Sequence, residues 1–182
     1  MDLAPGVLLV AEPALLDPNF RRTVVLLCDH NDEGSFGLIL NRPTELHLGE
    51  VLAESIALDA PLYFGGPVQT DSLHYLHAYA DEVDEAVAVL DGVGWGGPFD
   101  EIIEQVQQGT LDADGFRFYV GYSGWGAGQL AEEIDEGGWI VLPGSAAAVF
   151  GGDPTVLWRD VMRSLGGEYA LLSTYPDDPR MN

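Results

Sequence analysis

The segment GYSGWGAGQL, residues 121–130, decides how the second half of this chain folds. It follows Phe116–Tyr122, where apolar and polar residues alternate as they do in a strand. It leads into Leu130–Glu136, which has the apolar spacing of a short helix. Its glycines permit backbone angles that other residues avoid. The segment therefore predicts a tight strand-to-helix turn that carries one exposed aromatic side chain. For Trp125 two places are open: it packs over the core, or it lines a shallow cleft.

Outward from this turn, short apolar runs predict the remaining strands, and spacings of three and four predict the helices. The predicted strands are Val7–Ala11, Thr23–Cys28, Phe36–Leu40, Leu62–Phe64, Leu73–His77, Ala86–Leu90, Phe116–Tyr122 and Trp139–Leu142. The predicted helices are Gly49–Glu54 (a single turn), Pro98–Gln108, Leu130–Glu136 and Pro154–Leu165. Pro154–Leu165 is the last helix predicted in the chain. Residues 23–40 should form a hairpin with a long polar loop. Strands and helices do not alternate regularly, so an α+β fold is favoured over a doubly wound sheet.

The chain is strongly acidic, and its net negative charge argues against binding to other polyanions. There are 30 Asp and Glu residues against seven basic residues, for a formal net charge of −23. All seven basic residues are arginines, at positions 21, 22, 42, 117, 159, 163 and 180. Such a charge repels nucleic acids, anionic membranes and phosphate ligands in general, so direct DNA binding is disfavoured. One hypothesis is that the protein works in concentrated salt, where charge repulsion is screened; the alternative is an acidic protein of an ordinary cytoplasm.

Length and apolar patterning point to one domain, residues 1–182, in the cytoplasm. A chain of 182 residues can bury a substantial core, and no linker or repeat divides it. No run of about 18 apolar residues predicts a membrane span. The first residues, MDLAPGVLLVAEP, lack the basic region of a signal peptide. The single Cys28 excludes an internal disulfide and suits a reducing compartment.

Three glycine- or histidine-containing motifs resemble catalytic or cofactor sites without completing them. GVGWGG at 92–97 fits a dinucleotide fingerprint, but Asp100, Glu101 and Glu104 would repel a pyrophosphate, so a glycine-rich turn is favoured. GYSGWG departs from a nucleophile elbow because Trp125 replaces its last glycine. The acids around Cys28 and His30 read as a solvated turn. The sequence therefore predicts no cofactor, no metal and no catalytic set.

A group of arginines is the more informative feature. DPNFRRTV and NRP flank adjacent predicted strands and hold three of the seven arginines. In so acidic a chain, clustered arginines either pair with carboxylates or bind an anionic group. Pairing of Arg22 or Arg42 with Asp17 is the first interpretation, and a carboxylate or phosphate ligand is the second.

Taken together, several segments resemble the YqgE/AlgH family of bacterial proteins. They are spread over nearly the whole chain: GVLLVAEPALLDPNFRRTVVLLCDH, GLILNRP, YFGGPV, GYSGWGAGQL with its acidic helix, Trp139, and YPDDPRMN. Ala131 departs from the family, which usually has Glu there. The resemblance implies a cytosolic α+β domain whose bifurcated mixed sheet curls into a pseudo-barrel with flanking helices. It supplies no activity, although family members are often labelled transcriptional regulators.

Three hypotheses about function follow. The first is a non-enzymatic binding or regulatory protein that acts through a protein partner or a small anionic ligand. Its cleft would be shaped by Asp17, Arg22, Asn41, Arg42, Gly65, Gly66, Trp125 and Gln129. The second is an enzyme of unknown class, such as a hydrolase that uses Ser123 or Asp17 with His30. The third is a transcriptional regulator, for which no helix-turn-helix and no basic face are present in the sequence.

Overall fold

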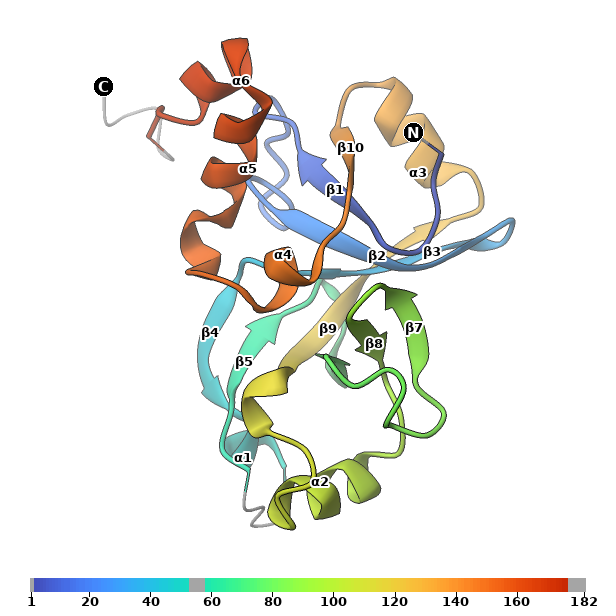
Figure 1. Ribbon diagram of the computed structural model, residues 1–182. Coiled ribbons are helices and arrows are strands. Elements are labelled where there is room, and N and C mark those ends of the chain that lie inside the picture. Colours follow the sequence, from blue (N-terminus) through green and yellow to red (C-terminus); the bar gives the residue numbers. More distant parts are fainter. Residues whose placement is uncertain (1, 53–57, 177–182) are drawn as a thin grey trace.

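The computed structural model describes residues 2–52 and 58–176 (Figure 1). The strands are β1 (Val7–Ala11), β2 (Val24–Asn31), β3 (Gly34–Ile39), β4 (Pro43–His47), β5 (Pro61–Phe64), β6 (Val68–His77), β7 (Val87–Leu90), β8 (Val93–Trp95), β9 (Phe116–Gly126) and β10 (Trp139–Pro143). The α-helices are α1 (Leu48–Val51), α2 (Phe99–Gln107), α3 (Gln129–Asp135), α4 (Ala146–Phe150), α5 (Leu157–Leu165) and α6 (Gly167–Leu172). Short 3₁₀ turns precede β9 and α5, at Ala113–Gly115 and Pro154–Val156.

The strands form one curled sheet that divides at β9. Its order is β10-β1-β2-β3-β9-β6-β8-β7, and β5 with its partner β4 branches from β9. The second half of β9 pairs with β3, from Ser123 to Gly126, while its first half pairs with β6 and, in parallel, with β5. The expected bifurcated mixed sheet with flanking helices is therefore the fold that forms.

Glycines make this division possible because backbones approach closely there. A Cβ on Gly66 would lie 2.1 Å from the carbonyl carbon of Tyr122, and Gly66 has φ +154°. A Cβ on Gly121, at φ +69°, would lie 2.3 Å from the carbonyl oxygen of Gly66. Neither position accepts a side chain without moving the backbone. These two glycines let the segment after β5 lie close against the middle of β9.

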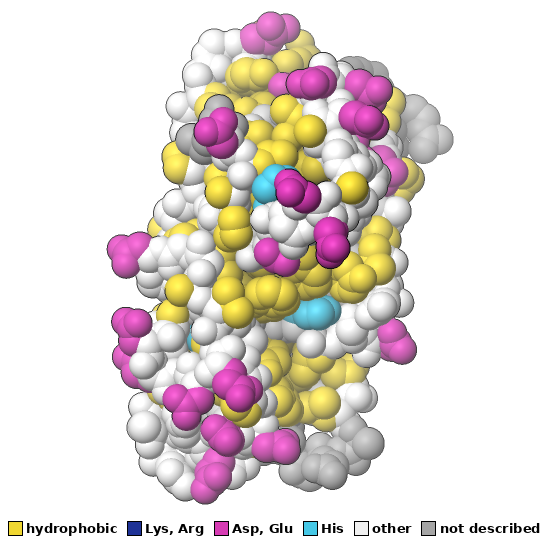
Figure 2. All heavy atoms as spheres, turned by 90° about the vertical axis from the view of Figure 1, so that its right-hand side faces the viewer, with side chains coloured by type: hydrophobic (Ala, Val, Ile, Leu, Met, Phe, Trp, Pro, Cys, Tyr) yellow, Lys and Arg dark blue, Asp and Glu magenta, His cyan; other side chains and the backbone are white. Residues whose placement is uncertain are grey.

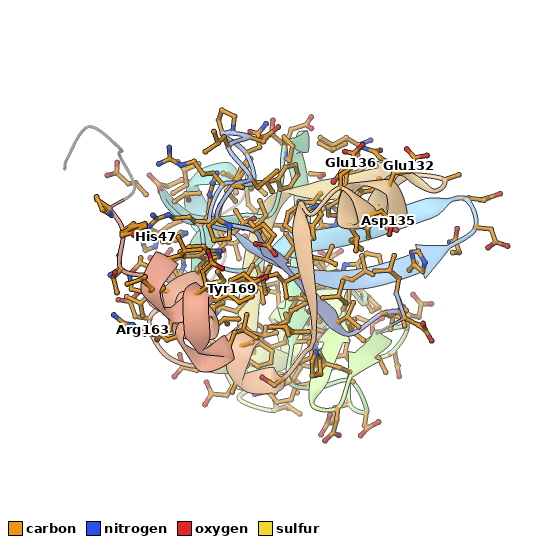
Figure 3. The ribbon with its side chains drawn as sticks, turned by 90° about the horizontal axis from the view of Figure 1, so that it is seen from above. His47, Glu132, Asp135, Glu136, Arg163 and Tyr169 are labelled. Atoms are coloured by element: carbon orange, nitrogen blue, oxygen red, sulfur yellow. The ribbon has the colours of Figure 1, made fainter. Side chains whose placement is uncertain are left out.

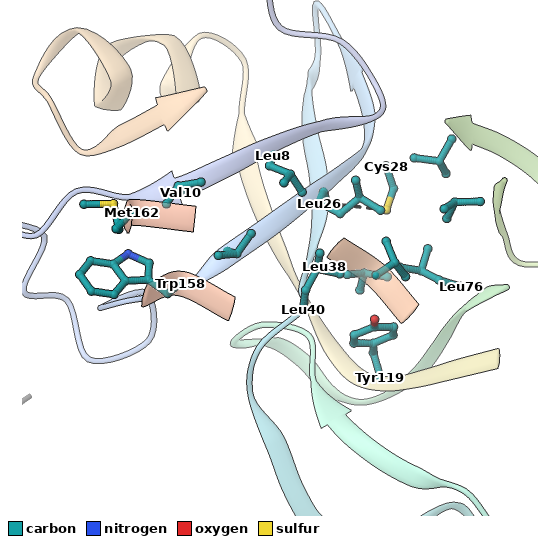
Figure 4. Close-up of a cluster of buried hydrophobic side chains, with 14 residues drawn as sticks. Leu8, Val10, Leu26, Cys28, Leu38, Leu40, Leu76, Tyr119, Trp158 and Met162 are labelled. Carbon is teal, nitrogen blue, oxygen red and sulfur yellow. Dashed lines mark hydrogen bonds between the residues drawn. The ribbon is translucent and has the colours of Figure 1, made fainter. Parts of the chain in front are cut away.

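Two buried clusters fill the two faces of the β1–β2–β3 region. Leu8, Val10 and Leu26 point to the face that α5 covers with Trp158 and Met162 (Figure 4). Leu9, Val25 and Leu27 point to the other face, where they meet Trp125, Leu130 and Trp139. Because successive strand residues face opposite sides, the continuously apolar runs of β1 and β2 indicate strands buried on both faces, as the sequence predicts.

A third buried cluster lies under α2 at the other end of the molecule (Figure 1). Ile102 and Ile103 of α2 pack there with Phe116 and Phe118 of β9. The predicted helix Pro98–Gln108 is confirmed within a residue at each end, with Pro98 at its N-cap. The spacing of its apolar residues predicted the helix correctly because only one face of the helix is buried.

The glycine turn predicted within residues 121–130 is shorter than expected, because β9 continues to Gly126 and α3 begins at Gln129. The turn itself is confined to Ala127 and Gly128, and Gly128 has φ +75°. Trp125 packs in the core, and the prediction of an exposed side chain is wrong, since the residue is only 5% exposed. Pairing with β3 holds the segment extended, and this long-range interaction outweighs the local preference of glycine for turns.

Other boundaries differ from the predictions for related reasons. β2 and β3 run into the polar segment, so Asn31 pairs with Gly34 and the predicted long loop shrinks to two residues. The chain after Arg42 forms β4 beside β5, with Pro43 as its first residue, where a missing N–H is tolerated. A further helix, α6, follows α5. The predicted turn at 49–54 overlaps α1 but extends into residues 53 and 54, outside the described part.

No helix within the described residues is both long enough and apolar enough to cross a membrane.

Candidate functional site

Four of the seven arginines line one pocket, which we call the arginine pocket. Its volume is about 250 Å³. The residues that line it are Arg21, Arg22, Asn41, Arg42, Thr155, Trp158 and Arg159. They come from three places in the chain: the loop between β1 and β2, the end of β3, and the start of α5. Of the described residues in this lining, none is an Asp or a Glu.

Asn41 fixes the loop that carries Arg21 and Arg22. Its side-chain oxygen accepts the N–H of Val24 at 2.8 Å, and its amide donates to the carbonyl of Arg22 at 2.9 Å. Arg22 has φ 55°, a left-handed conformation that is uncommon for a residue with a side chain. The Asn41 amide therefore holds Arg22 in a conformation that the isolated loop would rarely adopt.

Arg42 closes the same loop from the other side. Its Nη1 donates to the carbonyl of Pro18 at 3.0 Å, and its Nη2 donates to the carbonyl of Arg21 at 2.8 Å. Burial lowers the pKa of Arg42 below its usual range, and the nearby charge of Arg21 lowers it further, while Asp17 acts in the opposite direction. Positive charge is thus concentrated here, and an anion in the pocket would relieve it.

Arg22 packs against the aromatic residue of the pocket. Its guanidinium lies 4.9 Å from the centre of the Trp158 ring and donates to the carbonyls of Tyr175 and Pro176, at 2.8 and 3.0 Å. The Trp158 indole donates in turn to the carbonyl of Ala11 at 2.8 Å. Trp158 is buried beside β1 (Figure 4). The core therefore sets the position of the Arg22 guanidinium.

Arg159 has a buried donor that the protein does not use. Its Nε is shielded from solvent and has no hydrogen-bond partner among the described residues. A buried unsatisfied donor is costly, and groups of this kind are rare in folded proteins. Arg159 lies in the first turn of α5, where the helix dipole favours negative charge. The helix dipole therefore suits an anion at the start of α5.

The predicted pairing of Arg42 with Asp17 does not form among the described residues. Arg42 is held by carbonyls, and Asp17 accepts the N–H of Asn19 at 2.8 Å. Asp17 lies instead in a second pocket, of about 500 Å³, which we call the acidic pocket. Its lining is Ala14, Leu15, Asp17, Phe20, Gln129, Glu133, Glu136, Gly137, Gly138 and Trp139.

Glu133 organises the aromatic residues beside the acidic pocket. Its Oε2 accepts the indole N–H groups of both Trp125 and Trp139, each at 2.9 Å, and its Oε1 accepts the Gln129 amide at 3.0 Å. Phe20 packs against both indoles, with ring centres 6.0 and 5.5 Å away. Through Trp125, Gln129 and Trp139, Glu133 therefore links β9, α3 and β10.

The predicted cleft is thus divided. Arg22, Asn41 and Arg42 share the arginine pocket, and Asp17 and Gln129 share the acidic pocket. The other three members, Gly65, Gly66 and Trp125, lie in the lining of neither pocket. Four pocket residues escaped the sequence analysis as site candidates: Arg21, Thr155, Trp158 and Arg159. The sequence offered one signal: basic residues are so few that each arginine is a candidate for the site. The contact between α5 and the β1–β2 loop, however, cannot be inferred from the sequence.

The residues of the hydrolase hypothesis are engaged separately. Ser123 is fully buried and its hydroxyl donates to the carbonyl of Gly65 at 3.0 Å. His30 Nδ1 lies 2.7 Å from the hydroxyl of Ser35. Burial raises the pKa of the Cys28 thiol well above its usual range, which disfavours the reactive thiolate. Within residues 2–52 and 58–176, no three His, Cys, Asp or Glu side chains gather as a metal-binding set.

Charge is unevenly distributed over the surface. Asp and Glu side chains are scattered over the whole face shown in Figure 2, on which no Arg is visible. Seen from above, Glu132, Asp135 and Glu136 of α3 lie on one side of the sheet, and Arg163 and Tyr169 lie on the other (Figure 3). The arginine pocket gathers four of the seven arginines of an otherwise acidic protein.

The curled sheet with its flanking helices places the protein in the mixed α+β class. Comparison of the sequence places it more narrowly: residues 8–170 match the AlgH-like family, and the chain belongs to that family. UPF0301 proteins of Chlorobaculum tepidum and Chlorobium limicola are 44% and 42% identical to it over 180 residues, which are 99% of this chain and 96% of each relative.

Two solved structures share the fold. Protein DIP2367 from Corynebacterium diphtheriae superposes with a TM-score of 0.81 at 28% identity, covering 96% of this chain and 94% of that one. The solution structure of the AlgH protein from Pseudomonas aeruginosa superposes with a TM-score of 0.73 at 30% identity, covering 98% of this chain and all of that one. The resemblance seen in the sequence is confirmed.

Proposed function

We propose that this chain is a non-enzymatic binding protein that takes a small anionic ligand in the arginine pocket. The observation that carries the proposal is the convergence of four of the seven arginines on one pocket of about 250 Å³ in a chain of net charge −23. Gathering like charges costs free energy, and an anionic ligand in the pocket would reduce that cost. Arginine suits this role because its planar donors match carboxylate and phosphate groups.

The pocket is also preorganised for binding. Asn41 and Arg42 fix the β1–β2 loop, and Trp158 supports Arg22. Since these side chains are ordered before a ligand arrives, binding loses less conformational entropy. A regulatory role follows naturally if ligand occupancy changes the surface around the loop and α5.

A thermal-shift screen of anionic metabolites and nucleotides against the full chain tests this proposal. At 100 times its Kd, a ligand stabilises the native state by about 2.7 kcal/mol. For a chain of this size that raises Tm by roughly 5–10 °C. We expect a hit that is lost in Arg42→Ala and kept in Arg163→Ala, an exposed arginine beside Asp160. A folded protein that no anion stabilises would refute the proposal.

A further inference from the structure

We infer that the outer edge of β10 binds an extended, basic segment of a protein partner as an added strand. β10 ends the sheet order: β1 pairs with it on one side, and no described strand pairs with it on the other. An exposed sheet edge offers backbone donors and acceptors that a further strand can use. In Figure 1, β10 lies between α3 and the pair α5 and α6. This surface is separate from the arginine pocket, so it does not depend on anion binding there.

The register of β1 and β10 shows which backbone groups face outward. Gly138 accepts a hydrogen bond from one end of the β1 segment, and Gly144 donates one to the other end, each at 3.0 Å. Hydrogen-bonded positions in an antiparallel ladder recur at every second residue, so the even-numbered residues of β10 bond to β1. The backbone groups of Trp139, Val141 and Pro143 therefore point away from β1.

These outward groups have no hydrogen-bond partner among the described residues. They are the N–H groups of Trp139 and Val141 and the carbonyls of all three residues. Val141 is partly exposed and Pro143 is exposed, so this end of the edge meets solvent. Pro143 lacks an N–H where that N–H would face outward, a position that an edge strand tolerates. The edge can thus accept one further strand.

The charge at the start of β10 favours a basic segment over a second copy of the chain. The acidic pocket, of about 500 Å³, reaches Trp139 and presents the carboxylates of Asp17, Glu133 and Glu136, and no described residue of its lining is basic. Glu136 is exposed at the C-terminal end of α3, where the helix dipole favours a cation. A second copy would bring a net charge of −23 against this surface.

Antiparallel addition places the C-terminal end of the bound segment beside the acidic pocket. β10 runs from Trp139 to Pro143, and an antiparallel partner runs the other way. Basic side chains at that end meet Asp17 and Glu136, while β-branched residues earlier in the segment pair beside Val141. The partner segment is thus a short β-branched run followed by lysine or arginine.

Titration calorimetry on the full chain with two end-blocked peptides tests the inference. One is Thr-Val-Thr-Val-Lys-Lys, and the other has Glu in place of both Lys residues. At low ionic strength we expect the lysine peptide to bind at least tenfold more tightly than the glutamate peptide, and to weaken as KCl is added. Equal affinities, or no saturable binding of either peptide, would overturn the inference.

Val141→Pro removes the central outward N–H and leaves the bonds to β1 in place. It should weaken the lysine peptide at least tenfold, whereas Val141→Thr, which keeps the N–H and the branched side chain, should bind as the wild type does. A lysine peptide that is N-methylated throughout gives the same test on the wild type if the proline variant does not fold. Unchanged binding in these tests would overturn the strand pairing.

Two further measurements test the choice of partner. Glu136→Gln should weaken the lysine peptide about threefold or more, and Glu132→Gln, on α3 but outside the pocket lining, should not. Equal effects of the two variants would contradict recognition by the acidic pocket. Sedimentation of the free chain should show a monomer. A dimer that Val141→Pro dissociates would assign the edge to a second copy and overturn the inference.

Discussion

Arg42 donates from Nη2 to the backbone carbonyl of Arg21, 2.8 Å away, so one arginine of the pocket fixes the loop that carries two others. A second bond from Arg42 reaches Pro18 in the same loop. Arg42 is thus held by backbone carbonyls, which do not cancel its positive charge.

Arg42→Ala should weaken both the loop and the pocket. Two charge-assisted hydrogen bonds to carbonyls are lost, and we expect the free energy of unfolding to fall by about 2–4 kcal/mol. Urea denaturation measures this, and Arg163→Ala is the matched control because that side chain is exposed. A loss as small as that of the control would show that the bonds to Pro18 and Arg21 do not order the loop.

Gly66→Ala should be severely destabilising. The added Cβ would lie 2.1 Å from the carbonyl carbon of Tyr122, at the point where the sheet divides. We expect a loss of more than about 3 kcal/mol, or no folded protein at all. Gly49→Ala is the control: its Cβ meets nothing within 4 Å and lies in α1, so stability should be unchanged or slightly raised. Equal stability of the two variants would contradict the crossing of backbones at Gly66.

Glu133→Gln should loosen the aromatic cluster beside the acidic pocket. The carboxylate accepts from Trp125, Trp139 and Gln129, and an amide cannot accept all three bonds with the same strength. We expect a loss of roughly 1–3 kcal/mol and a change in tryptophan fluorescence. Glu136→Gln, on the exposed side of the same segment, should change neither. An unaltered spectrum in Glu133→Gln would show that the two indoles are positioned by packing alone.

Protonation of His77 should destabilise the protein below neutral pH. His77 is buried, and burial lowers its pKa below the unfolded value of about 6.5. Its Nε2 lies 2.9 Å from the carbonyl of Gly96, and its Nδ1 accepts the N–H of Tyr79 at 3.2 Å, which fixes the neutral form. Below pH 6.5 the unfolded chain binds the proton more readily, so this contribution to stability is lost as pH falls toward the folded pKa.

The comparison of wild type with His77→Gln isolates that contribution from the titration of the carboxylates. The stability difference between the two proteins, measured by urea denaturation from pH 8 to pH 5, should shrink as pH falls. A constant difference would mean that His77 has the same pKa in both states.

Salt should stabilise the native state if the acidic composition suits a saline environment. At 1 M KCl the screening length falls to about 3 Å, which suppresses repulsion among 30 carboxylates. We expect Tm to rise between dilute and molar KCl. A flat or falling Tm would favour an acidic protein of ordinary cytoplasm. Because anion binding weakens in the same salt, the two effects are measured separately.

How much the sequence predicts depends on how local each interaction is. Val7–Ala11 and Pro98–Gln108 were predictable because apolar spacing alone determines them. The extension of β9 through Gly121–Gly126 was not, because it depends on β3, about 90 residues earlier in the chain. The glycines were interpreted as turn residues for the same reason. Gly66 and Gly121 instead allow two segments of backbone to approach closely, and in the sequence this role cannot be distinguished from that of a turn.

The candidate site was predictable in part for a similar reason. Arg22, Asn41 and Arg42 stood out because they flank neighbouring strands. Arg159 did not, because only the packing of α5 against β1 and β2 brings it to the same pocket. Asp17 is a close neighbour of Arg21 and Arg22 in sequence, yet it lines the acidic pocket, since the loop turns between them.

Binding of inorganic phosphate to the full chain, followed by titration calorimetry at low ionic strength, tests the central claim most directly. The arginine pocket predicts saturable binding at one site, weakened at least tenfold in Arg159→Ala and unchanged in Arg163→Ala. Affinity should also decrease as KCl is added, because the attraction is between charges. Heats that do not saturate, or equal binding by the two variants, would contradict an anion site formed by these arginines.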